Sequence, residues 1–368
     1  MNENSENYFI WYPDRDQTYT EEYGSSRIPP IYSFNKEIGT TFTMDAGENT
    51  LILSFDKNAR PSDYNIRWPI LRPLQTAQDN PDNKILSKTI KILSGNLIIS
   101  GKPIISGNLI ISGKKEKSVN FYLNSEILGG YGHRIELQNS STFKIENAGI
   151  VRISNHINTK LRESTVVMSG ISRLTVEPVE KTQENNEVLE SNISLNCDFS
   201  ITEFSKAMLK SHHVHIDGGS IILQDNAKML ISSQVLNIRT DLDEKGCPLF
   251  DTNFTLKAGA TLLNLNSIDG IHFPLDIHRE NYPKGVFNFM AEGKENTGKV
   301  VIDVAPKDAN AYGLNTLLRK NFTAINGKVV ETGDQMKYFD FNYGKDIRNG
   351  NQVGTITISL IDPNLRLS

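Results

Sequence analysis

The residues best suited to chemistry lie in one short segment, SHHVHIDGG, at positions 211–219. If this segment is a strand, His213, His215 and Asp217 share one face, because alternate side chains of a strand point to the same side. Imidazole and carboxylate groups can together bind a transition metal when another part of the fold adds a ligand. The simpler interpretation is the polar outer face of a half-buried strand. We therefore predict these three as candidate binding residues, and we assign no metal and no cofactor.

Catalytic motifs give weaker signals. The segment RWPILR at positions 67–72 matches R-x-P-x-x-R, a pattern of pectate lyases in which an arginine acts as the base. It precedes the strand-rich part of the chain, so a proline-containing loop is the favoured interpretation. The paired-carboxylate motifs of polygalacturonase-type hydrolases are absent, and GYGH at positions 130–133 matches them only superficially. No Ser-His-Asp elbow, P-loop or dinucleotide fingerprint occurs, so the sequence favours a non-enzymatic protein and names no catalytic residue.

The composition narrows the choice of partners. The formal net charge of the 368 residues is −4, and Lys and Arg are spread among Asp and Glu. Nucleic-acid binders need a basic face, so we expect no nucleic-acid partner. No segment has the roughly 20 apolar residues that span a bilayer, so we expect no transmembrane segment. The two cysteines, Cys197 and Cys247, lack the spacing of a metal site, and the sequence leaves open whether they form a disulfide.

The elements that must position these residues are strands. Apolar and polar side chains alternate in STFKIENAGIVRIS, HVHIDGGSIILQDNAKMLIS and NFTLKAGATLLNLN. This period of two is typical of half-buried strands, and glycine suits the turns between them. In the histidine segment, Val214 and Ile216 should therefore point inward. Helical periodicity is scarce, and the charged segment at positions 177–190 is interpreted as a solvated loop or a short surface helix.

The strands recur with a regular step. Steps of 19 to 21 residues separate the strand positions Leu174, Ile193, Val214, Val235 and Phe254. A solenoid produces such a step when each coil stacks on the last. An antiparallel sandwich would favour shorter spacings and two-residue turns. The sandwich stays an alternative because four such pairs occur: Asp217-Gly218, Asp269-Gly270, Asn326-Gly327 and Asn349-Gly350.

A six-residue unit occurs four times in succession, as ILSGNL, IISGKP, IISGNL and IISGKK at positions 92–115. We interpret it as the first stacked coils, with Ser-Gly at the corners. The hexads also resemble the left-handed β-helix of hexapeptide acyltransferases, although here the period lasts only four units. We predict that residues 1–85 form an N-terminal cap or small domain, 86–305 the parallel β-helix, and 306–368 the C-terminal coils and cap.

The segments KAGATLLNLN and NAGIVRIS resemble strands and turns of right-handed parallel β-helices from secreted bacterial proteins. Autotransporter passengers, filamentous-haemagglutinin-type adhesins and VacA-like toxin passengers are the most similar in character. The resemblance implies an all-β fold class, a single-stranded right-handed parallel β-helix with an N-terminal cap. It transfers no active-site residue, because such folds carry many functions.

The same resemblance implies a non-enzymatic adhesin or toxin component. Such a protein would bind a host surface protein or a polysaccharide through the solenoid flank and the loops at positions 177–190 and 239–250. It would be secreted or at the cell surface, by a route without an N-terminal signal recognisable in this chain. One alternative is a polysaccharide lyase or glycoside hydrolase of the same fold, including a phage tailspike-like depolymerase. Another is a self-assembling scaffold.

Overall fold

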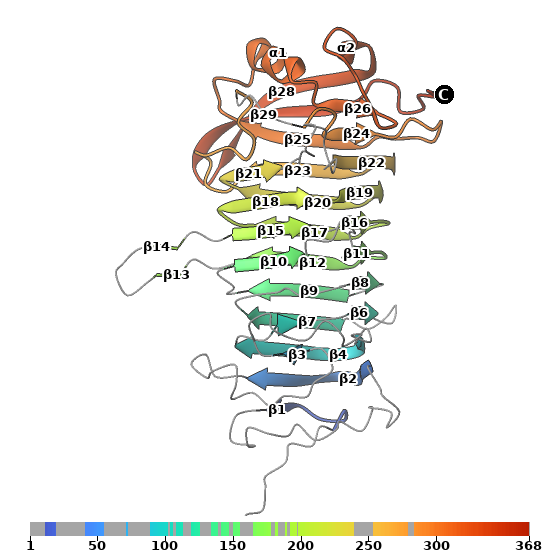
Figure 1. Cartoon of the computed structure of the whole chain (residues 1–368), viewed down its shortest axis with the longest axis vertical. Helices are drawn as coiled ribbons and strands as arrows, with labels where there is room; N and C mark the ends of the chain where they lie inside the picture. Colours follow the sequence, from blue (N-terminus) through green and yellow to red (C-terminus); the bar gives the residue numbers. More distant parts are fainter. Residues whose placement is uncertain are drawn as a thin grey trace, which may run out of the picture.

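The computed structural model describes residues 12–19, 41–54, 71–72, 89–101, 104–105, 108–112, 119–125, 134–138, 141–146, 150–154, 165–177, 181–182, 188–189, 192–196, 198–238, 253–278 and 283–367. These residues form an elongated stack of strands, most of which pair in parallel (Figure 1). β1 (Gln17–Tyr19) and β2 (Thr41–Ser54) lie at one end, and α1 (Ala311–Arg319) and α2 (Gln335–Tyr338) lie at the other. The prediction of an all-β, stacked and mostly parallel architecture is confirmed.

The strands fall into three rows, each made of strands that pair from coil to coil. Row 1 contains β10 (Ile150–Ser154), β15 (Asn192–Asn196), β18 (His213–Gly218) and β21 (Val235–Ile238). Row 2 contains the first halves of β2 and β4 (Thr89–Gly101), followed by β6 (Asn108–Ser112), β8 (Arg134–Gln138), β11 (Thr165–Met168), β16 (Asp198–Ile201), β19 (Ser220–Asp225), β22 (Asn253–Gly259), β24 (Phe287–Phe289) and β26 (Thr323–Ile325).

Row 3 begins with β1 and the second halves of β2 and β4. It continues through β7 (Val119–Ser125), β9 (Ser141–Glu146), β12 (Arg173–Glu177), β17 (Lys206–Lys210), β20 (Lys228–Ser233), β23 (Leu262–Ser267) and β25 (Lys299–Val304). Three short antiparallel pairings involve the remaining small strands: β3 (Leu71–Arg72) with β5 (Ile104–Ile105), β13 (Lys181–Thr182) with β14 (Val188–Leu189), and β26 with β27 (Lys328–Val329).

Alternation decides which side chains enter the core. Val214 and Ile216 of β18 are buried, as the sequence predicts. Ile193 and Leu236 occupy the register position of Val214 in the two neighbouring coils, and both are buried as well. Equivalent positions thus form files of apolar side chains along the stack. Full burial of one large apolar side chain is worth about 1.5–3 kcal/mol, so these files hold successive coils together.

The core becomes aromatic toward the C-terminal end. The ring of Phe254 stacks on that of Phe287 with centroids 6.1 Å apart, and Phe287 lies 6.1 Å from Phe322. Phe289 and Phe339 meet edge to face at 5.2 Å. These offset and edge-to-face arrangements are the ones that aromatic rings prefer, and they add to the energy of area burial.

The coil step is 22 residues where no segment is inserted. Ala207 pairs with Met229, 22 positions further along the chain. Insertions lengthen the step, and Leu174 pairs with Ala207, 33 positions further along. The predicted step of about 20 residues is therefore close to the uninterrupted coil. Its assignment was wrong for the steps from Leu174 to Ile193 and from Val235 to Phe254. Leu174 lies in row 3 and Phe254 in row 2, whereas Ile193 and Val235 lie in row 1.

A tight corner joins row 2 to row 3, and its backbone requires a positive φ. The residue with this φ is Gly95 in β4 (+90°), and in later coils it is Glu203 (+58°) and Asp225 (+63°). A Cβ atom at Gly95 would lie 2.8 Å from the carbonyl oxygen of Asn49, so only glycine fits there. The Ser-Gly corner predicted from the hexad repeat is confirmed at this position.

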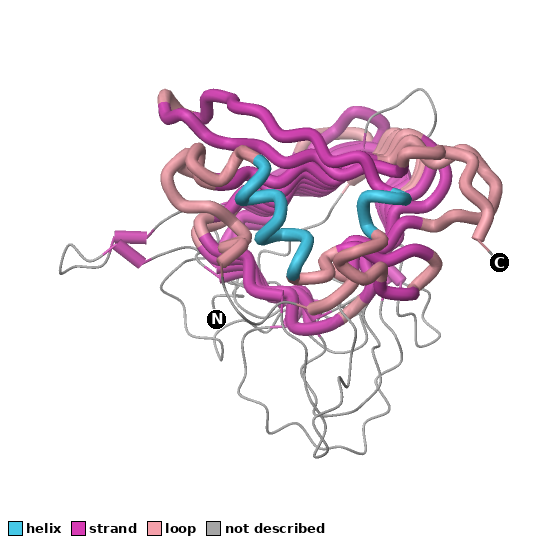
Figure 2. Tube along the Cα trace, turned by 90° about the horizontal axis from the view of Figure 1, so that it is seen from above, coloured by secondary structure: helices cyan, strands magenta, loops and turns pink. Residues whose placement is uncertain are grey.

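The parallel stack ends in antiparallel strands. β29 (Asn351–Leu360) pairs in antiparallel fashion with β25 on one side and with β28 (Phe339–Arg348) on the other. Figure 2 shows α1 and α2 above the stacked strands. The side chain of Asn310 accepts hydrogen bonds from the amides of Tyr312 and Gly313 and so caps α1, whose Leu317 and Leu318 are buried. Neither helix in the described part of the chain has the length and apolar character to cross a membrane.

Several segment predictions can be compared with the structure. β2 lies within residues 1–85, the predicted cap, and pairs in parallel with β4, so stacking extends into this range. The segment at positions 177–190 contains the antiparallel pair β13 and β14, which projects from the side of the stack (Figure 1). The expectation of a loop or short helix there is corrected to a small hairpin. The segment at positions 239–250, Cys197 and Cys247 lie outside the described residues, and the division into three parts stays a prediction.

Replacing Phe254 by alanine should lower the free energy of unfolding by about 3–5 kcal/mol, because it leaves a cavity next to the ring of Phe287. Urea denaturation followed by circular dichroism measures this loss. Lys257→Ala on the same strand removes a partly exposed side chain and should change the midpoint little. Equal midpoints for the two variants would contradict the stacked core.

Candidate functional site

The structure places two of the predicted residues together on the outer side of β18. The side chains of His213 and His215 are partly exposed, and their rings lie nearly parallel, with centroids 6.2 Å apart and planes at 18°. In the next coil, the amide of Asn237 lies 3.2 Å from Nδ1 of His215 and donates to it. In the preceding coil, Asn192 and Ser194 occupy the matching register positions. The outer side of row 1 is therefore a polar flank built from several coils.

Asp217 does not continue this pattern. Leu195 of β15 pairs with Ile216, but the next residue, Asn196, pairs with Gly218. Asp217 is thus the extra residue of a β-bulge, and at a bulge the simple alternation no longer decides where a side chain points. The side chain of Asp217 lies outside the described part of the structure, so the expectation that it shares the face of the two histidines stays a prediction.

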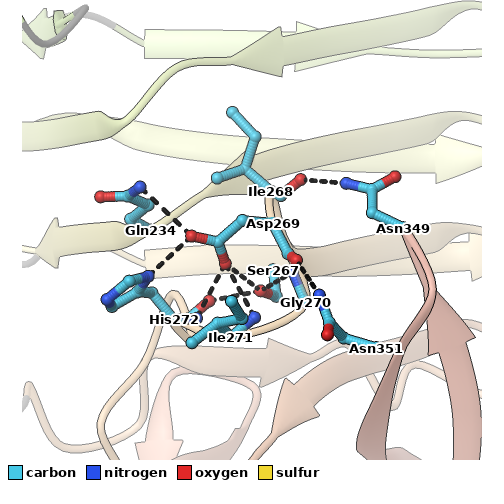
Figure 3. Close-up of polar contacts among 9 residues, drawn as sticks. All are labelled: Gln234, Ser267, Ile268, Asp269, Gly270, Ile271, His272, Asn349 and Asn351. Atoms are coloured by element: carbon cyan, nitrogen blue, oxygen red, sulfur yellow. Dashed lines mark hydrogen bonds and ion pairs between the residues drawn. The ribbon is translucent and has the colours of Figure 1, made fainter. Parts of the chain in front are cut away.

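A second polar group lies at the corner where row 3 turns into row 1 (Figure 3). Oδ1 of Asp269 accepts hydrogen bonds from the amides of Ile271 and His272, both at 2.8 Å. Oδ2 of Asp269 lies 2.6 Å from Nδ1 of His272 and 3.2 Å from Nε2 of Gln234. The backbone amide of Gln234 donates in turn to the carbonyl of His212 at 3.0 Å. His212, Gln234 and Asp269 therefore mark the same corner in successive coils.

These contacts set the charge of Asp269. Burial raises its pKa, but the amide and imidazole of His272 and the amide of Ile271 outweigh this effect and hold the pKa well below its usual value. The Asp269 carboxylate is therefore ionised at neutral pH. Its partner His272 is the more exposed of the two, with 61% of its side-chain surface accessible against 28% for Asp269.

The tip of the β28–β29 hairpin closes over this corner (Figure 3). The amide of Asn349 donates to the carbonyl of Ile268 at 2.6 Å, and that of Asn351 donates to the carbonyl of Asp269 at 2.9 Å. The approach is so close that a Cβ atom on Gly270 would lie 2.5 Å from the carbonyl oxygen of Arg348. These contacts bind the corner at Ile268 and Asp269 to the hairpin tip, which lies about 80 residues further along the chain.

A buried ion pair lies near this contact. Asp303 is fully buried, accepts a hydrogen bond from the amide of Ser267 at 2.9 Å, and lies 3.6 Å from Nε of Arg348. Burial raises the pKa of Asp303, while the Ser267 amide and the Arg348 guanidinium act in the opposite direction. Burial has the larger effect, so the pKa of Asp303 is raised. The contact with the partly exposed Arg348 adds to the antiparallel pairing of β29 with β25 that holds the hairpin against the stack.

Ser267, His272 and Asp269 are the residue types of an acyl-transfer triad, but their bonding is structural. The hydroxyl of Ser267 contacts the backbone carbonyl of His272 and accepts from the amide of Gly270 at 2.8 Å. A nucleophilic serine would instead contact the imidazole ring. Among the described residues, no group of three or more His, Cys, Asp or Glu side chains could hold a metal. The outer side of row 1 presents imidazole and amide groups, which can donate and accept hydrogen bonds.

The sequence did not predict that Asn237 contacts His215, or that Gln234 and Asp269 contact each other at the corner. Asn237 follows His215 by 22 positions, one uninterrupted coil step, so a correct step would have indicated it. Asp269-Gly270 was considered only as a hairpin turn. Of RWPILR, the structure describes only Leu71 and Arg72, in β3, and GYGH lies outside the described residues.

The chain matches no protein-family model, no curated protein and no solved structure. The resemblance to secreted bacterial β-helices therefore stays a prediction.

The low pKa of Asp269 predicts an acid-dependent contribution to stability. Because the folded pKa lies below the unfolded value of about 3.9, the contribution is complete above that pH and is lost as pH falls further. Asp269→Asn should lower the free energy of unfolding by about 1–2 kcal/mol at pH 7, where the charged contact to His272 is lost. The difference from wild type should shrink as the pH approaches 2.

Thermal denaturation between pH 2 and 7 measures this dependence. Asp362→Asn is the matched control, because the exposed Asp362 accepts a single backbone hydrogen bond, from Asn364. A constant difference between Asp269→Asn and wild type across the whole range would show that ionisation of Asp269 does not stabilise the corner.

Proposed function

We propose that this chain is a right-handed single-stranded parallel β-helix of the secreted bacterial type that binds a ligand along its flank. It acts as an adhesin or toxin component and is secreted or displayed at the cell surface. The parallel register of rows 1 to 3 and the 22-residue step of the uninterrupted coils support the fold. The resemblance of KAGATLLNLN and NAGIVRIS to such proteins supports the biological role.

The observation that carries the proposal is the outer side of row 1. His213 and His215 present two nearly parallel rings, and Asn237 extends the polar surface into the next coil. Imidazoles and amides both donate and accept hydrogen bonds, and ring faces pack against apolar C–H groups. A polysaccharide, with hydroxyl groups at its edges and C–H groups on its ring faces, fits this chemistry. A host surface protein is the other partner of the proposal.

The rigidity of the flank favours binding without a large entropic cost. Buried neighbours fix the backbone of β18, because Val214 and Ile216 point into the core. The Asp269 corner and the hairpin tip fix the adjoining edge of the flank. A surface that is already ordered loses little conformational freedom when a ligand binds. The β13–β14 hairpin projects beside this flank, between β12 and β15 in the chain, and adds a further contact region (Figure 1).

His213→Ala combined with His215→Ala should weaken ligand binding at least about fivefold, since each lost hydrogen bond is worth about 1 kcal/mol. Binding is measured on arrays of polysaccharides and host surface proteins and then titrated for every ligand that wild type binds. The matched control is Ser200→Ala combined with Thr357→Ala, two partly exposed positions in row 2 and in β29.

The same samples are assayed for new reducing ends and for unsaturated uronate absorbance. Binding that depends on the histidines, with no product formed, is the expected result. Turnover of a polysaccharide would contradict the non-enzymatic proposal and favour a lyase or hydrolase. Unchanged binding in the histidine variant would remove row 1 as the binding flank.

A further inference from the structure

One outer file of row 3 is cationic. Arg173 of β12 pairs with Lys206 of β17, and Lys206 pairs with Lys228 of β20. Lys228 pairs with Leu262 of β23, and Leu262 pairs with Lys299 of β25. Four of these five successive coils therefore place a cation at the same register position, along the length of the stack seen in Figure 1. Arg173, Lys206, Lys228 and Lys299 are called the cationic file below.

The side chains of the cationic file are exposed. In the part of the chain that the structure describes, none of them forms a salt bridge, whereas Lys210 at the other end of β17 pairs with Glu177 at 2.5 Å. At the adjoining corner, the Glu203 carboxylate accepts from the amide of Gly170 at 2.6 Å, and the Asp225 carboxylate accepts from the amide of Glu203 at 3.3 Å. These carboxylates bind the backbone of the corner, and among the described residues neither forms a salt bridge with a cation of the file.

The spacing of the file has an energetic consequence. Neighbouring strands lie about 4.8 Å apart, so adjacent coils bring their charges to about this distance at the backbone. Like charges directly opposite on neighbouring strands destabilise a sheet. The free protein therefore carries a repulsion between Arg173, Lys206 and Lys228 that a bound polyanion would relieve.

Apolar side chains accompany the cations at the corner. Ile171 and Phe204 precede Arg173 and Lys206 by two positions, and 57% and 60% of their surfaces are exposed. The amide of Phe204 donates to the carbonyl of Gly170 at 2.9 Å, which stacks the two turns on each other. A sugar ring has an apolar C–H face that can lie on such side chains while its acid group reaches the neighbouring cation.

We propose that the cationic file binds a linear acidic polysaccharide that runs along the stack and places about one carboxylate or sulfate group beside each cation. The inference rests on the proposed function, in which the outer side of row 1 binds a ligand. It adds the outer side of row 3 as a second binding surface and names the class of ligand. Duplex DNA fits less well, because it carries one charge per about 1.7 Å of axis, far denser than one cation per coil.

The test compares two triple variants with the same change of charge. Arg173→Gln, Lys206→Gln and Lys228→Gln together remove three of the four charges of the file and leave Lys299. Lys307→Gln, Lys328→Gln and Lys345→Gln together are the control, because these three lysines are exposed near the C-terminal end. Calorimetric titration of the full chain at low salt uses sodium polygalacturonate, dextran sulfate, uncharged dextran and a single-stranded thymidine oligonucleotide.

Wild type should bind polygalacturonate or dextran sulfate and should not bind uncharged dextran. Whichever of the two acidic polymers binds identifies carboxylate or sulfate as the preferred group. The file variant should bind at least about tenfold more weakly with a shallower salt dependence, because it neutralises fewer anionic groups. The control should keep the affinity of wild type. Without ligand, the file variant should melt roughly 1–3 °C higher at low salt, since the repulsion between coils is removed.

Equal affinities for the file variant and the control would overturn the inference, as would a preference of wild type for the oligonucleotide. Binding of a polysaccharide that is weakened by the histidine substitutions of row 1 but not by those of the file would overturn the cationic file and leave the proposed function standing. If wild type binds neither acidic polymer but binds another ligand on the arrays, the inference about the cationic file is overturned and the proposed function stands.

Discussion

The structure depends on the stacking of equivalent side chains in successive coils. Val214 lies between Ile193 and Leu236 in the core, and Phe254 stacks on Phe287, while each backbone pairs with the coil on either side. Once the inward side chain of a strand is placed, alternation also fixes its outward neighbours. The stacking of buried side chains therefore also decides which exposed side chains lie next to one another in successive coils, such as His215 and Asn237. A shift of the strand register by one residue would expose the buried side chains and bury the exposed ones.

The sequence predicts the local part of this arrangement well. Alternation identifies Val214 and Ile216 as buried, and the glycine at Gly95 marks a corner, because both signals lie within a few residues. The pairing of strands is not local. Leu174 pairs with Ala207 and not with Ile193, since an inserted hairpin lengthens that coil from 22 to 33 residues. A local period does not reveal such an insertion, because the pairing joins residues that are far apart in the chain.

The same distinction separates the predicted site residues from the missed ones. His213 and His215 were found because they are two positions apart in one strand, whereas the bulge at Asp217 depends on the partner strand β15. The cationic file is invisible in the linear sequence, where 33 and 22 positions separate Arg173, Lys206 and Lys228. Evenly spread charges in the chain become a row on the surface, because the coil step brings them into register.

The central claim is this register, and disulfide trapping tests it most directly. In a chain with Cys197→Ser and Cys247→Ser, the pair Lys206→Cys and Lys228→Cys occupies directly opposed positions about 4.8 Å apart at Cα, within disulfide range. The pair Lys206→Cys and Leu230→Cys is displaced by two residues and lies beyond that range. Mild oxidation followed by mass spectrometry should show cross-linking of the first pair and little of the second. Equal cross-linking of both pairs, or preference for the second, would contradict the stacking on which the proposed functions depend.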